Sequence, residues 1–271
     1  MWKKIYYIHC LLYCFSVILL SSWCSTYPVI AEEVSQEYSS PSWYNVSPPG
    51  IRNLSLFLGI LGTVFTVSKP EHPRPFAKAP DFDKNADRME WSKWAYDLGD
   101  HTPTIVTVGQ YLYYFIWPEK YRFERAVVFT EALLIMQGTV AFTKYTIGRQ
   151  RPDGSNNVSF PSGHTAHTFT WASYLATDII RRNSGAARWI YSAIPYSVAA
   201  FVGGSRISGS KHYLSDVTIG ALIGTFIGYT LYDFHFNDKG EYRFTEKNKI
   251  HLSINVLPSK DLYAMSLGSS F

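Results

Sequence analysis

The chain has 271 residues, of which 46% are hydrophobic and 17% aromatic, and its formal net charge is +4. This length allows one large domain or two small ones. The small net charge, without a block of lysine or arginine, argues against a protein that binds nucleic acid. The aromatic content is typical of tightly packed or membrane-adjacent helical proteins, whereas the mean hydropathy of -0.07 is low for a chain that is mostly transmembrane.

Residues 1–31 have the pattern of an export signal peptide. Lys3 and Lys4 precede an apolar run that ends at Leu20, and small residues follow near Ala31. An uncleaved N-terminal membrane anchor has the same pattern and is the alternative. All three cysteines lie in this segment, so its removal would exclude disulfides and cysteine-based metal sites from the mature protein.

Residues 32–84 form a polar, proline-rich region with one apolar segment. We expect a loose linker over 32–53 and a largely non-helical stretch over 68–84, because prolines interrupt both. The apolar segment between them, 54–67, is short for a membrane span.

The remainder predicts an all-α fold, a helical bundle over residues 85–235. An amphipathic helix is expected over 85–99, with Gly99 as its stop. Apolar helices are then expected over 104–117, 126–147, 165–180, 188–204 and 212–234. Because none of these runs indicates a core strand, helices must pack on helices. In the tail, 236–271, alternation over 249–256 and 261–267 predicts a short β-hairpin.

The stretch Phe160–Thr165 reads as a helix start that could hold an anion. Free N–H groups and the positive end of the helix dipole both favour negative charge there. Ser162 adds a hydroxyl donor, Gly163 permits close approach to the backbone, and His164 can give or take a proton near neutral pH. The same residues also suit an ordinary turn, so this stretch alone decides nothing.

Two further stretches add cations, a second histidine and a carboxylate. The first contains Lys144, six residues, then Arg151 and a proline; the second contains Arg206 after a serine, five residues, His212, three residues and Asp216. With the Pro-Ser-Gly-His stretch, they match the fixed positions of a three-part signature. The chain therefore resembles the type 2 phosphatidic acid phosphatase (PAP2) / vanadium haloperoxidase superfamily, with motifs over 144–216 and flanking helices over about 85–235.

The phosphate-binding residues follow from what phosphoryl transfer needs. Its transition state spreads negative charge over the equatorial oxygens, which fixed cations and backbone donors stabilise. We assign five residues to this binding role: Lys144, Arg151, Ser162, Gly163 and Arg206.

The resemblance implies the catalytic roles. His212 would be the nucleophile that forms a phosphohistidine, and Asp216 would hold its imidazole in one tautomer. His164 would protonate the leaving oxygen and then activate water. No metal or other cofactor is expected; vanadate is expected as an inhibitor, and as a cofactor only under a haloperoxidase alternative.

The sequence thus predicts a phosphatase acting on lipid phosphates or pyrophosphates, such as phosphatidic acid, an isoprenyl pyrophosphate or a lipid A phosphate. A broad-specificity soluble acid phosphatase, a vanadium-dependent haloperoxidase and a non-catalytic anion-binding envelope protein are the alternatives. We expect an exported protein of the periplasm or cell envelope, associated with the membrane, with its active site facing away from the cytoplasm. Whether the bundle spans the membrane or is soluble stays open.

The last predicted helix carries a seam of small residues. His212 and Asp216 are expected on one helical face, which Gly220, Gly224 and Gly228 continue at the same spacing. Glycines at this interval let a neighbouring helix approach closely.

Other polar residues near the motifs are interpreted as structural. His167 is expected to pack or to line a rim, and Asp153 to stabilise a turn. Asp97, Asp100 and His101 could border the pocket, but we interpret them as helix-end residues. Glu131 must face the bundle interior if its helix is embedded in lipid.

Overall fold

The computed structural model describes residues 46–68, 93–244, 251–258 and 263–270. The predicted signal segment, most of the linker and the first part of the helix expected over 85–99 lie outside these residues. Within them the helices are α2 (Pro49–Ser68), α4 (Lys93–Ile116), α5 (Arg122–Ile147), α6 (Gly163–Arg182), α7 (Ala187–Ser208) and α8 (Leu214–His235). The all-α prediction is confirmed.

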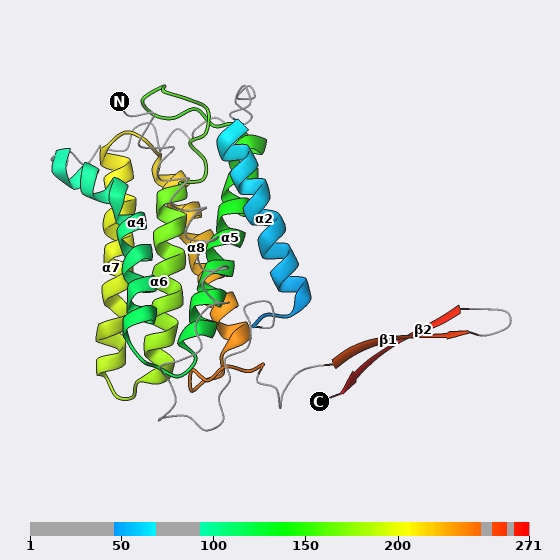
Figure 1. Ribbon diagram of the computed structural model, residues 1–271. Helices are drawn as coiled ribbons and strands as arrows, with labels where there is room; N and C mark the ends of the chain where they lie inside the picture. The colour runs from blue at the N-terminus through cyan, green and yellow to red at the C-terminus, as the bar shows by residue number, and fades with distance from the viewer. Residues whose placement is uncertain (1–45, 69–92, 245–250, 259–262, 271) are drawn as a thin grey trace. The chain divides into compact units, whose positions relative to one another are not determined.

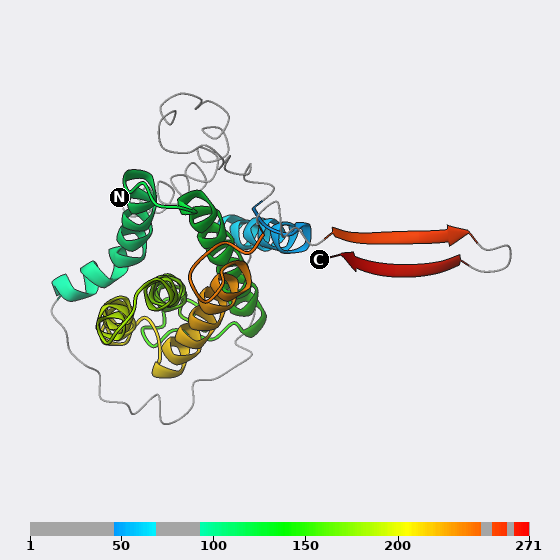
Figure 2. The same cartoon turned by 90° about the horizontal axis from the view of Figure 1, so that it is seen from below.

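Helix α6 is the centre of the bundle. It packs most extensively against α8 and α7, and also against α5 and α4, whereas α2 packs on the far side of α5. Figures 1 and 2 show α6 between these neighbours. Residues at the start of α6 are therefore within reach of the ends of three other helices.

The predicted glycine seam sets the distance between α8 and α6. A Cβ atom on Gly220, Gly224 or Gly228 would collide with backbone carbonyl oxygens of Ser162, Ala166 and Thr170, respectively. The backbone of α8 therefore contacts the backbone of α6 directly at these three glycines, which have no side chain to separate the helices. This close approach brings the N-terminal turn of α8 beside the Pro-Ser-Gly-His stretch.

Several helix boundaries differ from the sequence prediction, and three of these differences change how a residue or segment is interpreted. Helix α2 begins at Pro49, inside the predicted linker, so the apolar segment belongs to a 20-residue helix. Helix α4 continues through Gly99 and Pro103 to Ile116. Gly99 does not end it, because this glycine serves close packing instead: a Cβ atom there would collide with Ser205.

The third difference concerns α8, which begins at Leu214 after an extended N-cap residue, Tyr213. His212 therefore precedes the helix, and the prediction that it shares a helical face with Asp216 is wrong. The imidazole is instead carried by the segment that joins α7 to α8.

The tail forms the predicted hairpin. Strands β1 (His251–Pro258) and β2 (Tyr263–Ser270) pair antiparallel, with His251 opposite Ser270 and Pro258 opposite Tyr263. Figure 1 shows the two strands side by side.

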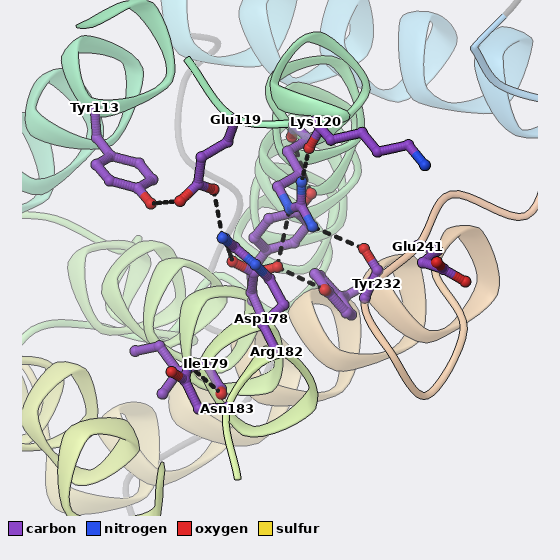
Figure 3. Close-up of polar contacts among 12 residues, drawn as sticks. Tyr113, Glu119, Lys120, Asp178, Ile179, Arg182, Asn183, Tyr232 and Glu241 are labelled. Carbon is purple, nitrogen blue, oxygen red and sulfur yellow. Dashed lines mark hydrogen bonds and ion pairs between the residues drawn. The ribbon is translucent and has the colours of Figure 1, made fainter. Parts of the chain in front are cut away.

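A buried polar network lies near the C-terminal end of α6 (Figure 3). The carboxylate of Asp178 accepts hydrogen bonds from Arg125 Nε at 2.9 Å, from the Tyr232 hydroxyl at 2.6 Å and from Arg182 Nη1 at 3.0 Å. Arg182 also pairs with Glu119 at 2.6 Å. The network joins α5, α6 and α8 at the end of α6 remote from the sequence motifs.

The outer faces of the helices are apolar. Among the described residues, α5 and α8 are long and apolar enough to cross a membrane. Large hydrophobic side chains are exposed on α2, α4, α7 and α8: Phe57, Ile60, Val64, Ile105, Val108, Leu112, Phe115, Trp189, Ile190, Ile194, Leu222 and Phe226. Exposure on this scale indicates a surface that is covered by apolar surroundings.

Candidate active site

The three sequence motifs meet at one end of the bundle. They occupy the last turn of α5 and the loop after it, the first turn of α6, the last turn of α7 and the segment leading into α8. Figure 1 shows these ends together, with the loop 148–162 arching over them. Residues up to 72 positions apart in sequence thus contribute to one site.

The Pro-Ser-Gly-His stretch is a helix start, as predicted. Ser162 is the N-cap of α6, with extended backbone, and Gly163 is the first helical residue. The Ser162 hydroxyl lies 2.9 Å from that of Thr165, and its N–H donates to the Asp216 carbonyl at 3.0 Å. The backbone bond ties the start of α6 to the start of α8, next to the groups predicted to bind phosphate.

Lys144 fastens the loop to α5. Its ammonium donates to the carbonyls of Val158 at 2.8 Å and Pro161 at 2.6 Å. A Cβ atom on Gly163 would lie 3.7 Å from Lys144 Cε, so the lysine stem runs beside the glycine. The Lys144 ammonium therefore lies close to the backbone at the start of α6.

Arg151 is held within the loop. Its Nε donates to Asn156 Oδ1 at 2.9 Å. The charge of Arg151 acts on Lys144, His164 and His212. The structure thus places these four predicted site residues close enough for their charges to interact.

Arg206 is only 2% exposed, yet its guanidinium is fully engaged. Nη2 donates to the Tyr96 carbonyl at 2.8 Å, and the group stacks 4.5 Å from the Tyr96 ring centroid. Nη1 donates to the carboxylate of Asp100, which also lies 3.2 Å from His164 Nε2. Asp100 therefore links a predicted phosphate-binding cation to the predicted acid.

This position corrects the interpretation of Asp100. Asp97, Asp100 and His101 all lie inside α4, not at its end, because the helix continues to Ile116. Asp100 is a member of the site, so the preferred helix-end role was wrong and the alternative, a residue bordering the pocket, is closer to the structure.

His212 and Asp216 are both buried, with exposed fractions of 3% and 0%. Asp216 Oδ1 accepts a hydrogen bond from Arg149 Nη1 at 2.7 Å, and Oδ2 accepts from the Ser159 hydroxyl and, at 3.0 Å, from the Tyr213 N–H. His212 Nδ1 lies 3.7 Å from Asp216 Oδ2, just beyond hydrogen-bonding distance. The carboxylate is thus fixed in front of the imidazole.

The surroundings of His212 keep its imidazole neutral. Burial lowers its pKa from 6.5 to about 3, and the positive charges of Lys144 and Arg151 act in the same direction, against Asp216. A neutral imidazole has a free lone pair, which a nucleophile requires.

Arg149 and Ser159 are further members of the site that sequence reasoning did not identify. Both bind Asp216, and Arg149 lies between two fixed motif positions, Lys144 and Arg151. For Arg149, its position between two cationic motif residues was the sequence signal that could have identified it as a site residue.

The interpretations of His167 and Asp153 agree with the structure. His167 Nε2 shares a hydrogen bond with the Thr107 hydroxyl at 2.7 Å, which is a packing role. Asp153 accepts from the Ser155 N–H at 3.0 Å within a turn and also pairs with Lys211 at 2.7 Å. Within the described ranges, no group of three or more His, Asp or Glu side chains is arranged to hold a metal ion.

Comparison with known proteins gives relatives of one kind. Lipid A 1-phosphatase of Porphyromonas gingivalis is 39% identical over 130 residues, covering 46% of this chain and 28% of the relative. A probable diacylglycerol pyrophosphate phosphatase of Schizosaccharomyces pombe is 32% identical over 80 residues, covering 27% of this chain and 29% of the relative. The chain thus spans less than a third of the length of these two curated relatives.

Among solved structures, Aquifex aeolicus LpxE aligns with 55% of this chain and 90% of its own, at 23% identity and a TM-score of 0.42. The family model of the PAP2 superfamily matches residues 125–239, which include all three motifs. The part of the chain that carries the three motifs, residues 125–239, therefore matches the PAP2 superfamily.

Proposed function

We propose that this protein is a phosphatase that releases phosphate from lipid phosphate monoesters or pyrophosphates through a phosphohistidine on His212. The observation that carries the proposal is the pairing of a buried, neutral His212 with a fixed carboxylate, beside a second histidine and three cations. The PAP2 match over residues 125–239 and the relatives named as lipid phosphatases support the same reaction class.

In the first step, His212 Nε2 would attack phosphorus. A P–N bond forms as the P–O bond to the leaving group breaks, and His164 in its protonated form gives its proton to the leaving oxygen. Asp216 would stabilise the positive charge that His212 acquires. Lys144, Arg151 and Arg206 would offset the negative charge on the equatorial oxygens.

In the second step, His164, now neutral, would take a proton from water. The resulting hydroxide attacks phosphorus, the P–N bond breaks, and inorganic phosphate leaves with His212 restored. This sequence balances without a metal or a redox partner.

Lipid substrates are proposed because the bundle presents apolar side chains to its surroundings. The exposed faces of α2, α4, α7 and α8 would contact hydrocarbon, and the site lies at one end of the bundle, where a lipid head group would lie. The two apolar helices α5 and α8 are consistent with spanning segments.

The experiment that tests the function is phosphate release by the purified full chain from a substrate panel. The panel contains phosphatidic acid, an isoprenyl pyrophosphate, a lipid A phosphate and a small aryl phosphate, with His212→Ala as the blank. We expect preferred turnover of a lipid phosphate, inhibited by vanadate and abolished in His212→Ala. Equal or better turnover of the aryl phosphate would instead indicate a broad acid phosphatase.

Two results would overturn the proposal more deeply. Halide oxidation that requires added vanadate would indicate a haloperoxidase, and tight phosphate binding without turnover would indicate a non-catalytic anion-binding protein. Retained turnover in His212→Ala would refute the phosphohistidine mechanism alone.

We also propose that the active-site end faces away from the cytoplasm. Basic residues gather at the other end: Lys120 lies before α5, Arg122 is its first residue, and Arg188 lies at the start of α7, as expected for a cytoplasmic side. A cysteine at exposed Ser155 should react with an impermeant maleimide in intact cells, after replacement of the native cysteines. A cysteine at exposed Lys239 should react only after lysis, and the reverse pattern would refute this orientation.

A further inference from the structure

The carboxylate of Asp216 is held by more than the histidine that it faces. It has no exposed surface, and three donors converge on it: Arg149 Nη1, the Ser159 hydroxyl and the Tyr213 N–H. A buried carboxylate keeps its charge only where cations and hydrogen-bond donors replace water. The donors around Asp216 therefore determine whether its carboxylate stays ionised and can stabilise the charged form of His212.

Arg149 supplies the positive charge among these three donors. Its Nη1 lies 2.7 Å from Asp216 Oδ1 and 2.8 Å from the Ser215 hydroxyl, so the guanidinium is turned toward the start of α8. The ring of Phe160 covers it at 4.5 Å from the ring centroid. The residue is 8% exposed, and these contacts fix the orientation of its side chain.

The neighbouring arginine differs in its contacts. Arg151 binds Asn156 within the loop, and its charge acts on both histidines. Arg149 binds the carboxylate behind His212 instead. Two arginines separated by one residue therefore face different parts of the site.

The state of Asp216 matters because His212 must present Nε2 to phosphorus. That tautomer carries its proton on Nδ1, which lies 3.7 Å from Asp216 Oδ2. An ionised carboxylate accepts from Nδ1 and stabilises the imidazolium that forms on attack, whereas a neutral or displaced one does not. Loss of the Arg149 charge would therefore slow the attack by His212 on phosphorus but would not abolish it.

We propose that Arg149 is a positioning residue for the nucleophile, which keeps Asp216 ionised and aimed at His212 Nδ1 and does not itself bind phosphate. This inference rests on the proposed phosphatase function. It separates Arg149 from the assigned phosphate-binding cations Lys144, Arg151 and Arg206.

The test compares Arg149→Met and Arg149→Lys with wild type in the purified full chain. Methionine removes the charge and keeps an unbranched side chain, whereas lysine restores a cation without the planar fork. We expect Arg149→Met to lower kcat about 100-fold, within the range of acid–base contributions, with KM and inhibition by inorganic phosphate within about threefold of wild type. Arg149→Lys should recover part of kcat, and the exposed neighbour Gln150→Met should match wild type.

A second readout follows the step directly. The rate at which labelled phosphate appears on the enzyme after mixing should fall in Arg149→Met as much as kcat does. A variant that merely lost folded protein would show a smaller labelled fraction with an unchanged rate. If Arg149→Met does not fold, Arg149→Lys alone carries the test, with a partial loss of kcat at unchanged KM.

Each outcome is decisive. A rise in KM and in the phosphate inhibition constant at unchanged kcat would show that Arg149 binds phosphate and would overturn the inference. Wild-type kinetics in Arg149→Met would do the same. Absence of turnover by wild type would refute the proposed function itself, and this inference with it.

Discussion

Asp100 in α4 and Arg206 in α7 form an ion pair across 106 residues of sequence, and the same carboxylate oxygen lies 3.2 Å from His164 Nε2. One acid thus touches both a group assigned to the phosphate and the group assigned to the leaving oxygen. Arg206 is buried, so its orientation depends on the few partners that it has.

Replacing Asp100 by Asn should lower kcat/KM by about tenfold or more. A hydrogen bond to a charged group contributes about 1.5–3 kcal/mol, and its loss would free the Arg206 guanidinium and the His164 ring to reorient. Steady-state kinetics on a lipid phosphate measure the effect. Asp100→Glu should recover part of it, and Asp97→Asn, one turn away on α4, is the matched control; full activity in Asp100→Asn would show that the ion pair is dispensable.

His212 predicts a specific loss of stability in acid. Its pKa is about 3 in the folded protein, below the ordinary 6.5, because burial disfavours the charged ring. Between these two values the unfolded chain binds a proton that the folded chain does not, so this residue destabilises the fold as pH falls from about 6.5 toward 3. Above 6.5 it contributes no pH dependence.

The measurement is the thermal midpoint of wild type and His212→Gln as a function of pH. Wild type should lose more stability than the variant between pH 6.5 and 4, and the two should run in parallel above pH 7. Parallel curves throughout would contradict a buried, neutral imidazole. The same state predicts that His212 remains unprotonated at pH 5, which its ring carbon chemical shift would report.

Motif spacing located the groups that the site brings together, because the fixed positions cluster at helix ends. His164 follows an N-cap serine, and Lys144 lies in the last turn of α5, so both could be placed from local pattern. Arg206 likewise lies in the last turn of α7. Hydrophobic periodicity then sufficed to predict a helical bundle around them.

The residues that were missed depend on tertiary contacts. Asp100 looks like any acid on a helix, and only the approach of α7 gives it Arg206 as a partner. Gly99 satisfied the local rule for a helix stop, but it is glycine because Ser205 packs against it. His212 was predicted as the first residue of the last helix, because the extended backbone of Tyr213 leaves no trace in the hydrophobic pattern.

The close contact between α6 and α8 predicts the effect on stability of replacing each glycine of α8 by alanine. Gly224→Ala should destabilise the protein by about 1–3 kcal/mol, because its Cβ would collide with the Ala166 carbonyl and the α6 backbone cannot yield. Gly109→Ala in α4 is the control, since no atom lies within 4 Å of its Cβ position. There alanine should be neutral or stabilising by up to about 1 kcal/mol.

Thermal unfolding in detergent measures both substitutions. Activity adds a second comparison, because Gly220 lies against Ser162 at the site, whereas Gly228 lies against Thr170, two turns further along α6. Gly220→Ala should lower kcat of the folded protein, and Gly228→Ala should lower stability alone. Equal kinetic effects of the two would show that the seam does not set the geometry of the site.

The network around Asp178 predicts a substitution that lowers stability and leaves activity unchanged (Figure 3). Asp178→Asn would leave Arg125, which is 3% exposed, without its carboxylate partner. Removing one member of a buried ion pair costs about 3–5 kcal/mol, because the other charge stays buried and uncompensated. The thermal midpoint should therefore fall sharply.

The kcat per folded molecule should not change, because Asp178 lies near the C-terminal end of α6 and the site lies at its N-terminal end. Asp238→Asn is the matched control: its side chain is 95% exposed and only 3.7 Å from Arg181, so its pairing should contribute less than about 1 kcal/mol. A fall in kcat of Asp178→Asn at full occupancy of the folded state would mean that the two ends of α6 are coupled. An unchanged thermal midpoint would mean that water, not Asp178, compensates the Arg125 charge.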